Sequence, residues 1–223
     1  MYPRGNLFIP VSHGQLEGIL REPRVGPIRG VALLLHPHPL GGGTMHNKVV
    51  FRAAAAVNDA DLVALRINFR GVGQSTGTHD DGSGELEDVR AGLDYLTSHY
   101  PDLPITLAGF SFGARVGLEV GIEDRRVVRL ISIGTPVDKY DFRFLEACHK
   151  PILFVHGDRD EFGSTSKLQN LVTSLKPEAH ARLEFIQGAD HFFEGYLNRL
   201  KEIITEWVTE ELQSRHLPFT MPS

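Results

Sequence analysis

Short apolar runs alternate with amphipathic, helix-length stretches along this chain, and this rhythm constrains the fold more than any other feature. Residues 31–36 and 105–110 are nearly continuous apolar runs, as expected for strands buried on both faces of a sheet. Strands that alternate with helices imply βαβ crossovers, and therefore an α/β fold with a mostly parallel central sheet and helices on both faces. We expect strands at residues 7–11, 15–20, 31–36, 62–69, 105–110, 128–133, 152–155 and 183–186, and helices at 47–58, 85–98, 112–122, 166–175 and 192–215.

The beginning of the chain departs from this rhythm. Two short strand-like runs flank Ser12-His13-Gly14, which favours an N-terminal antiparallel hairpin at one edge of the sheet. The chain has 223 residues, 41% of them hydrophobic, and no linker divides it, so we expect a single domain over residues 1–223. The last residues, 216–223, contain two prolines and are expected to trail off the surface.

Composition narrows the class of protein. The formal net charge of -5 argues against a partner such as nucleic acid or an anionic membrane, which a basic surface would bind. The single cysteine, Cys148, can form neither an internal disulfide nor a Cys-rich zinc site. No apolar run approaches the roughly 20 residues that span a membrane, and residues 1–5 do not begin a secretory signal. We therefore expect a cytoplasmic protein; nothing in the sequence specifies its oligomeric state.

A candidate nucleophile, Ser111, stands in the sequence Gly109-Phe-Ser-Phe-Gly113. This Gly-x-Ser-x-Gly pattern follows an expected strand and precedes an expected helix, which is the setting of a nucleophile elbow. The glycines leave room for a tight turn that lifts the serine hydroxyl above the sheet. The following helix directs its N-terminal dipole at the same point and favours developing negative charge there.

A serine nucleophile needs a histidine base and an acid that orients it, and in an elbow protein they follow in the order Ser, Asp or Glu, His. Asp158 and Asp160 both come directly after the expected strand at residues 152–155. His191 lies in the loop after the last expected strand. Because the carboxyl ends of parallel strands share one edge of a sheet, these side chains are expected to lie near Ser111.

With these motifs in place, the chain resembles the α/β-hydrolase superfamily over nearly its whole length. In that superfamily the acid follows a Gly-x-x-Asp pattern, which selects Asp160, and the base a pattern like Gly-x-x-His, which matches Gly188 to His191. More narrowly, the chain is similar to small bacterial hydrolases related to dienelactone hydrolase, although that enzyme has a cysteine where this chain has Ser111. The motifs that carry this narrower resemblance are His36-Pro-His-Pro-Leu-Gly-Gly, Met45-His-Asn-Lys-Val-Val50, Asn68-Phe-Arg-Gly-Val-Gly-Gln-Ser75, Gly109-Phe-Ser-Phe-Gly-Ala114 and His191-Phe-Phe193.

An acyl-transfer site also needs two donors for the oxyanion of its tetrahedral intermediate. One is expected to be the backbone N–H of Phe112, the residue after the nucleophile. The other is expected from the loop after residues 31–36, where Pro37 and Pro39 have no N–H to give. The hydrolase pattern places His38 at this position, with Leu40 as the alternative if the loop is shifted.

Other motifs suggest different chemistry. His36, His38 and His46 could bind a metal ion, but no nearby carboxylate completes a ligand set, so we expect neither a metal nor a cofactor. The glycines between residues 71 and 77 imitate a dinucleotide-binding loop with the wrong spacing. Arg70 begins a turn like the Arg-Gly-x-Gly-x-Ser turn of many hydrolases, and we favour a structural role that braces loops beneath the site.

The expected function is therefore that of a serine hydrolase of carboxylesterase type, acting on small soluble carboxylic esters. The gap from about residue 134 to 150 leaves room for a loop and one short helix, which implies no lid domain. Leu40, Phe162 and Phe192 could line an apolar substrate pocket. The alternatives are a thioesterase, a peptidase-like amide hydrolase, a metal- or nucleotide-dependent enzyme, or a catalytically silent interaction protein.

Overall fold

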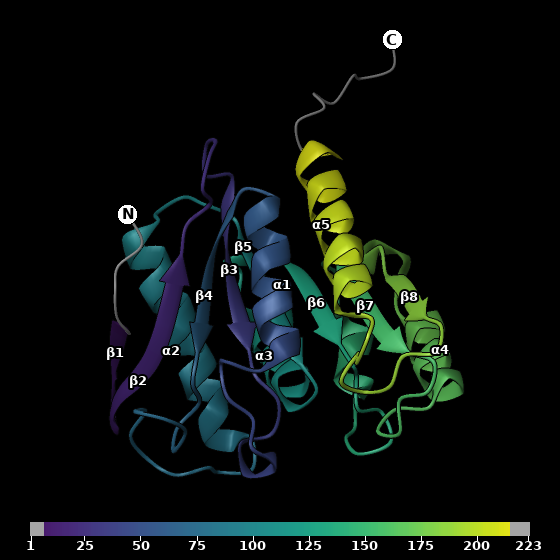
Figure 1. The fold of residues 1–223 in the computed structure, drawn as a ribbon, viewed down its shortest axis with the longest axis horizontal. Coiled ribbons are helices and arrows are strands. Elements are labelled where there is room, and N and C mark those ends of the chain that lie inside the picture. The colour runs from purple at the N-terminus through teal and green to yellow at the C-terminus, as the bar shows by residue number, and fades with distance from the viewer. Residues whose placement is uncertain (1–6, 215–223) are drawn as a thin grey trace.

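The computed structural model describes residues 7–214, which form an eight-stranded sheet in the order β1-β2-β4-β3-β5-β6-β7-β8 (Figure 1). β1 pairs with β2, and β2 with β4, in antiparallel fashion, whereas the remaining neighbours are parallel. The predicted fold class is thereby confirmed, hairpin included. The strands are β1 (Leu7–Val11), β2 (Gly14–Arg21), β3 (Gly30–Leu35), β4 (Leu62–Ile67), β5 (Ile105–Phe110), β6 (Val127–Ile133), β7 (Ile152–Gly157) and β8 (Arg182–Ile186).

The helices lie close to their expected positions, with one clear exception. α5 begins five residues later than predicted, because the side chain of Asp190 accepts hydrogen bonds from the backbone N–H groups of Phe192 and Glu194. Phe193 and Gly195 also adopt positive φ angles, which a helix does not tolerate. The helices are α1 (Lys48–Asp59), α2 (Ser83–His99), α3 (Phe112–Glu123), α4 (Thr165–Ser174) and α5 (Leu197–Ser214). The expected helical residue 215 and the expected surface course of residues 216–223 lie outside the described residues.

The two faces of the sheet are covered by different helices, as Figure 1 shows. Along β3, Val31, Leu33 and Leu35 point into a core shared with α2 and α3, while Ala32 and Leu34 point into a core shared with α1 and α5. This alternation follows from the two-residue period of a strand. Because both faces are covered, β3 is buried throughout, which explains its continuous apolar sequence.

The carboxyl ends of the parallel strands meet at one edge, where the connecting loops gather. The connection from β6 to β7, residues 134–151, contains one short 3₁₀ helix (Arg143–Ala147) and no helical lid, as predicted. Within residues 7–214, no helix is both long and apolar enough to cross a membrane.

Candidate active site

Ser111 occupies the sharp turn between β5 and α3. Its backbone angles are φ 56° and ψ −116°, a strained combination for a residue with a side chain. Its N–H donates to the carbonyl oxygen of Ile133 in the neighbouring strand, 2.9 Å away. Because Ser111 stands just before the first residue of α3, its hydroxyl lies at the positive end of that helix dipole.

The two glycines of the motif are required by close backbone contacts. A Cβ atom on Gly109 would lie 2.3 Å from the carbonyl carbon of Gly113. A Cβ atom on Gly113 would lie 2.6 Å from the carbonyl oxygen of His36, at the end of β3. Gly109 therefore packs against the first turn of α3 and Gly113 against the end of β3, so closely that no side chain fits at either position.

His191 and Asp160 join Ser111 in one hydrogen-bonded chain. Nε2 of His191 lies 2.9 Å from Oγ of Ser111, and Nδ1 of His191 lies 2.7 Å from Oδ2 of Asp160. An ionised carboxylate only accepts hydrogen bonds, so Nδ1 carries the proton and Nε2 of the neutral ring accepts from the serine hydroxyl. The ring of His191 is 3% exposed, and the rings of Phe162 and Phe110 lie 4.5 and 4.9 Å from it, centroid to centroid.

The structure distinguishes clearly between the two aspartates after β7. Asp160 turns inward, where its second oxygen accepts a hydrogen bond from the N–H of Phe162 at 2.8 Å. Asp158 is exposed, and its carboxylate accepts instead from the N–H of Gly188 at 2.6 Å. Asp160 is thus in contact with His191, whereas Asp158 ties two loops together at the surface.

Two backbone N–H groups near Ser111 are available to a ligand. Among residues 7–214, neither the N–H of Phe112 nor that of His38 has an acceptor. Leu40, the alternative donor, gives its N–H to Nδ1 of the His38 ring, 3.2 Å away. The N–H groups of residues 41–43 are all used by carbonyl oxygens within the same loop.

Of the three histidines considered as metal ligands, His36 has both ring nitrogens engaged by backbone groups. His36 is fully buried: its Nδ1 donates to the carbonyl oxygen of Pro37 at 2.6 Å, and its Nε2 accepts from the N–H of Phe69 at 3.0 Å. Burial lowers the pKa of His36 to about 4, so the ring is neutral at pH 7 and connects the ends of β3 and β4. No cluster of three or more His, Cys, Asp or Glu side chains suited to a metal ion occurs within the described part of the chain.

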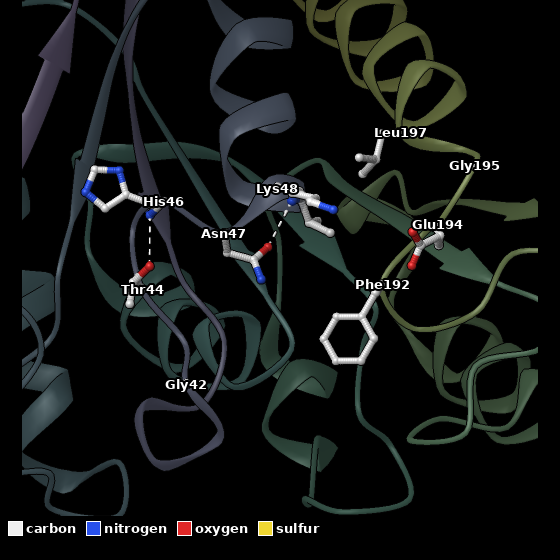
Figure 2. Close-up of a pocket in the computed structure, with 10 residues that line it drawn as sticks. Gly42, Thr44, His46, Asn47, Lys48, Phe192, Glu194, Gly195 and Leu197 are labelled. Carbon is white, nitrogen blue, oxygen red and sulfur yellow. Dashed lines mark hydrogen bonds between the residues drawn. The ribbon is translucent and has the colours of Figure 1, made fainter.

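A pocket of about 420 Å³ lies between the beginning of α1 and the loop before α5; Phe192 lines it, but Ser111, Asp160 and His191 are not among its lining residues. In Figure 2, Asn47 and Lys48 face Phe192 and Glu194 across this pocket. Of the three residues predicted to line a substrate pocket, Phe192 lines this one, and its ring lies 5.2 Å from that of His191. Phe162 packs on His191 instead, and Leu40 is 78% exposed.

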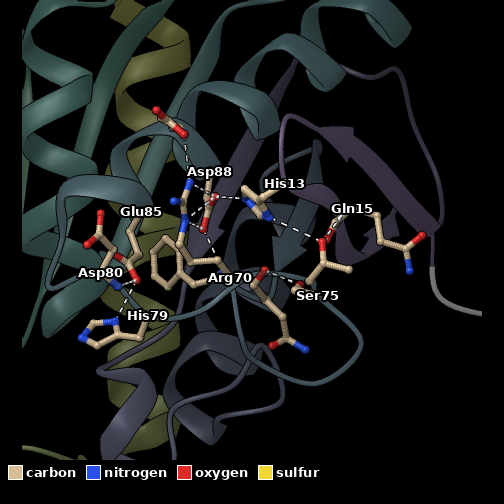
Figure 3. A network of polar contacts seen from close by, with 12 residues as sticks. His13, Gln15, Arg70, Ser75, His79, Asp80, Glu85 and Asp88 are labelled. Carbon is tan, nitrogen blue, oxygen red and sulfur yellow. Dashed lines mark hydrogen bonds and ion pairs between the residues drawn. The ribbon is translucent and has the colours of Figure 1, made fainter.

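Sequence reasoning missed a polar network in the loop between β4 and α2. The guanidinium of Arg70 contacts the buried carboxylate of Asp88 at 2.9 Å, which is consistent with the expected bracing role. His13, from the turn of the hairpin, contacts the same carboxylate at 3.2 Å (Figure 3). His79 contacts the carboxylate of Glu85, in the first turn of α2, at 2.7 Å. The contacts of Asp88 with Arg70 and His13 follow no local pattern, since they join residues 18 and 75 positions apart.

His156 is a second residue that the sequence did not single out. Its Nε2 donates to the carbonyl oxygen of Gly163 at 2.6 Å and lies 3.7 Å from Oδ2 of Asp160. Burial lowers the pKa of His156. The hydrogen bond fixes the loop that carries Asp160, and the only sequence signal was a histidine at the end of an otherwise apolar strand.

Comparison with known proteins agrees with this architecture. A family model described as an alpha/beta hydrolase domain matches residues 30–208, and the chain therefore belongs to that family. An uncharacterized protein of Rickettsia prowazekii (strain Madrid E) is 37% identical over 209 residues, which cover 91% of this chain and 87% of the relative.

Solved structures extend the comparison. An alpha-beta serine hydrolase homologue from Coxiella burnetii is 37% identical, with a TM-score of 0.87, and the match covers 92% of this chain and 97% of that one. A serine hydrolase without a lid from Xanthomonas campestris is 31% identical, with a TM-score of 0.84, and the match covers 97% of this chain and 96% of that one. Membership of the α/β-hydrolase superfamily, expected from the motifs, is confirmed.

Proposed function

We propose that this protein is a serine carboxylesterase that hydrolyses small soluble carboxylic esters through an acyl-enzyme. The observation that carries the proposal is the hydrogen-bonded chain from Ser111 through His191 to Asp160. A serine hydroxyl 2.9 Å from an imidazole nitrogen can lose its proton as it attacks, which activates an otherwise weak nucleophile. The carboxylate of Asp160 stabilises the imidazolium that this transfer creates.

Acylation uses the proposed triad and the two available N–H groups. Oγ of Ser111 bonds to the ester carbonyl carbon while His191 takes the hydroxyl proton on Nε2. The carbonyl oxygen becomes an oxyanion, which the N–H groups of His38 and Phe112 stabilise. The bond to the alcohol oxygen then breaks, and His191 returns the proton to that oxygen, so that the alcohol leaves and the acyl group remains on Ser111.

Deacylation repeats the same steps with water in place of the alcohol. His191 accepts a proton from a water molecule, whose oxygen bonds to the acyl carbon. The bond to Oγ breaks, Ser111 recovers its proton from His191, and the carboxylic acid is released. No step in this sequence calls for a metal ion or an organic cofactor.

Two features support the proposed substrate class. The pocket next to Phe192 has both apolar and polar walls, and the connection between β6 and β7 carries no helical lid, which favours a small, partly polar acyl or alcohol group over a long lipid chain. We expect short aryl esters to be hydrolysed faster than long-chain ones. Faster hydrolysis of thioesters or amides in the same panel would favour those alternatives.

Labelling with a fluorophosphonate tests the proposed nucleophile. We expect covalent modification of Ser111 in the wild-type protein, no labelling of Ser111→Ala, and ester hydrolysis that a chelator does not affect. Ser132→Ala is a matched control, since that buried hydroxyl contacts Thr135 rather than a histidine. Activity that survives in Ser111→Ala but disappears with the chelator would replace this proposal by a metal-dependent one, and a folded protein that neither labels nor hydrolyses would indicate an interaction protein.

A further inference from the structure

A second histidine–carboxylate pair lies beside the proposed oxyanion donors. Nδ1 of His79 is 2.7 Å from Oε1 of Glu85, whose side chain is completely buried in the first turn of α2. The same carboxylate accepts hydrogen bonds from the backbone N–H groups of Asp80 at 3.1 Å and Gly82 at 2.9 Å. Figure 3 shows His79 and the Asp80 backbone converging on Glu85. His79 is therefore held at one ring nitrogen by a group that is itself fixed.

Glu85 is an ionised anchor. Burial alone would raise the pKa of its carboxyl, but the hydrogen bonds from Asp80, Gly82 and His79 outweigh that effect and hold the pKa below its usual value. An ionised carboxylate requires a donor, so Nδ1 of His79 carries a proton and the orientation of the ring is set. The other nitrogen, Nε2, lies 3.3 Å from the exposed carboxylate of Asp81 but is not aligned for a hydrogen bond.

The His79 ring contacts both residues whose N–H groups are proposed to bind the oxyanion. Its centroid lies 4.8 Å from that of His38 and 5.5 Å from that of Phe112. The rings of His38 and Phe112 are themselves 4.9 Å apart, so the three rings form a closed triangle. The side chain of His79 is 8% exposed, which leaves little freedom for this cluster to move.

We infer that His79, oriented by Glu85, is a positioning residue that keeps the N–H groups of His38 and Phe112 directed at one point. This inference rests on the proposed function. Phe112 is already fixed by α3, whereas His38 lies in a loop between two prolines, so the ring contact acts mainly on His38. Removal of one oxyanion donor costs roughly 10²–10³ in kcat, and a donor that is displaced rather than lost should cost less.

The protein contains a matched control for this inference. His13 also contacts a buried carboxylate of α2, that of Asp88, one turn further along the helix (Figure 3). Unlike His79, it has no ring contact with His38 or Phe112 among the described residues. His13→Ala therefore removes an equivalent anchor of α2 and leaves the ring triangle intact.

The experiment compares kcat and KM for a short aryl ester, normalised to the folded fraction from circular dichroism. We expect His79→Ala to lower kcat about tenfold to a hundredfold with KM changed less than about threefold, since an oxyanion forms only after substrate binds. His13→Ala should stay within about twofold of wild type. Equal losses in both variants would overturn the inference, because they would indicate general loosening of α2.

A second variant and a second measurement separate positioning from simple packing. His79→Phe keeps a ring against His38 and Phe112 but cannot donate to Glu85, so it should recover less than half of the lost kcat. The affinity of a phenylboronic acid, whose adduct with Ser111 carries negative charge like the oxyanion, should fall in His79→Ala by about the same factor as kcat/KM. Unchanged boronate affinity, or full activity in His79→Phe, would overturn the role assigned to the anchored ring.

The two proposals fail in different ways. If the wild-type protein neither reacts with a fluorophosphonate nor hydrolyses esters, the proposed function is wrong and the inference falls with it. If the wild type is active and labelled at Ser111 but His79→Ala matches it in kcat and boronate affinity, only the inference is wrong.

Discussion

Asp158 and Asp160 have identical side chains two positions apart, yet they lie in different environments. The turn after β7, closed by a hydrogen bond from the N–H of Asp160 to the carbonyl oxygen of Gly157, directs one carboxylate inward and the other to the surface. Local sequence cannot separate them, since both follow the same strand; only a family pattern favoured Asp160. Ser111 was easier to predict, because its flanking glycines are required by the local backbone path.

The paired aspartates give a prediction at this scale. Asp160→Asn should lower kcat about 10²–10⁴-fold, because an amide no longer selects the imidazole tautomer or stabilises the imidazolium. Asp158→Asn should remain within a few-fold of wild type, since its carboxylate accepts a hydrogen bond from the N–H of Gly188 and, among residues 7–214, has no contact with His191. Steady-state kinetics on an aryl ester measures both variants. A larger loss in Asp158→Asn would show that the surface aspartate, rather than the buried one, supports the reaction.

Loops that join elements account for most of what the sequence did not predict. Strand and helix positions followed from apolar periodicity, but the late beginning of α5 depends on Asp190 and on two left-handed residues that periodicity does not register. The same is true of the loop between β4 and α2, whose shape depends on carboxylates buried under it. Contacts between distant segments follow from the completed fold and not from any local pattern.

Arg70 provides the prediction at the scale of elements. Its guanidinium and its backbone N–H both donate to the buried carboxylate of Asp88, which ties this loop to α2. Arg70→Ala removes a positively charged partner of that buried carboxylate, so it should lower the free energy of unfolding by about 1–3 kcal/mol. Arg143→Ala, which removes an exposed pair with Asp141, should change it by less than about 0.5 kcal/mol. Urea unfolding measures the free energy of unfolding of both variants. Equal losses in Arg70→Ala and Arg143→Ala would contradict the bracing role of Arg70.

At the scale of the whole molecule, the alternation of buried strands and amphipathic helices was sufficient to predict the parallel sheet, while the two strand-like runs around Ser12-His13-Gly14 predicted the hairpin edge and the short gap at residues 134–150 predicted the absence of a lid. These features are robust because they depend on many residues at once: the two cores on either side of β3 are each built from several elements. The protonation states of buried side chains are harder to predict from the sequence. The residue type of His36 does not show that its ring is neutral; the burial of the ring and its two hydrogen bonds between the ends of β3 and β4 do.

This buried histidine predicts how stability depends on pH. Its pKa is lowered from 6.5 to about 4 on folding, so the unfolded chain binds a proton in a range where the folded protein does not. The contribution of the neutral His36 ring to the free energy of unfolding is present in full above pH 6.5 and is lost progressively as the pH falls toward 4. The loss amounts to about 3 kcal/mol.

Urea unfolding at pH 7 and pH 4.5 measures the effect. Wild type should lose more stability between these pH values than His36→Asn, which cannot titrate there. His99→Gln, a change at an exposed histidine, should follow the wild-type pH dependence. Parallel pH curves for wild type and His36→Asn would show that protonation of His36 does not contribute.

The short connection between β6 and β7 also bears on which step limits the rate of turnover. In enzymes whose active site is covered by a lid, opening of the lid is often the slowest step of the catalytic cycle. Residues 134–151 hold only one turn-length helix, so substrate arrival and product departure require no such opening. If the protein acts as proposed, the rate of turnover is then set by bond making and breaking at Ser111, and solvent viscosity should have little influence on kcat.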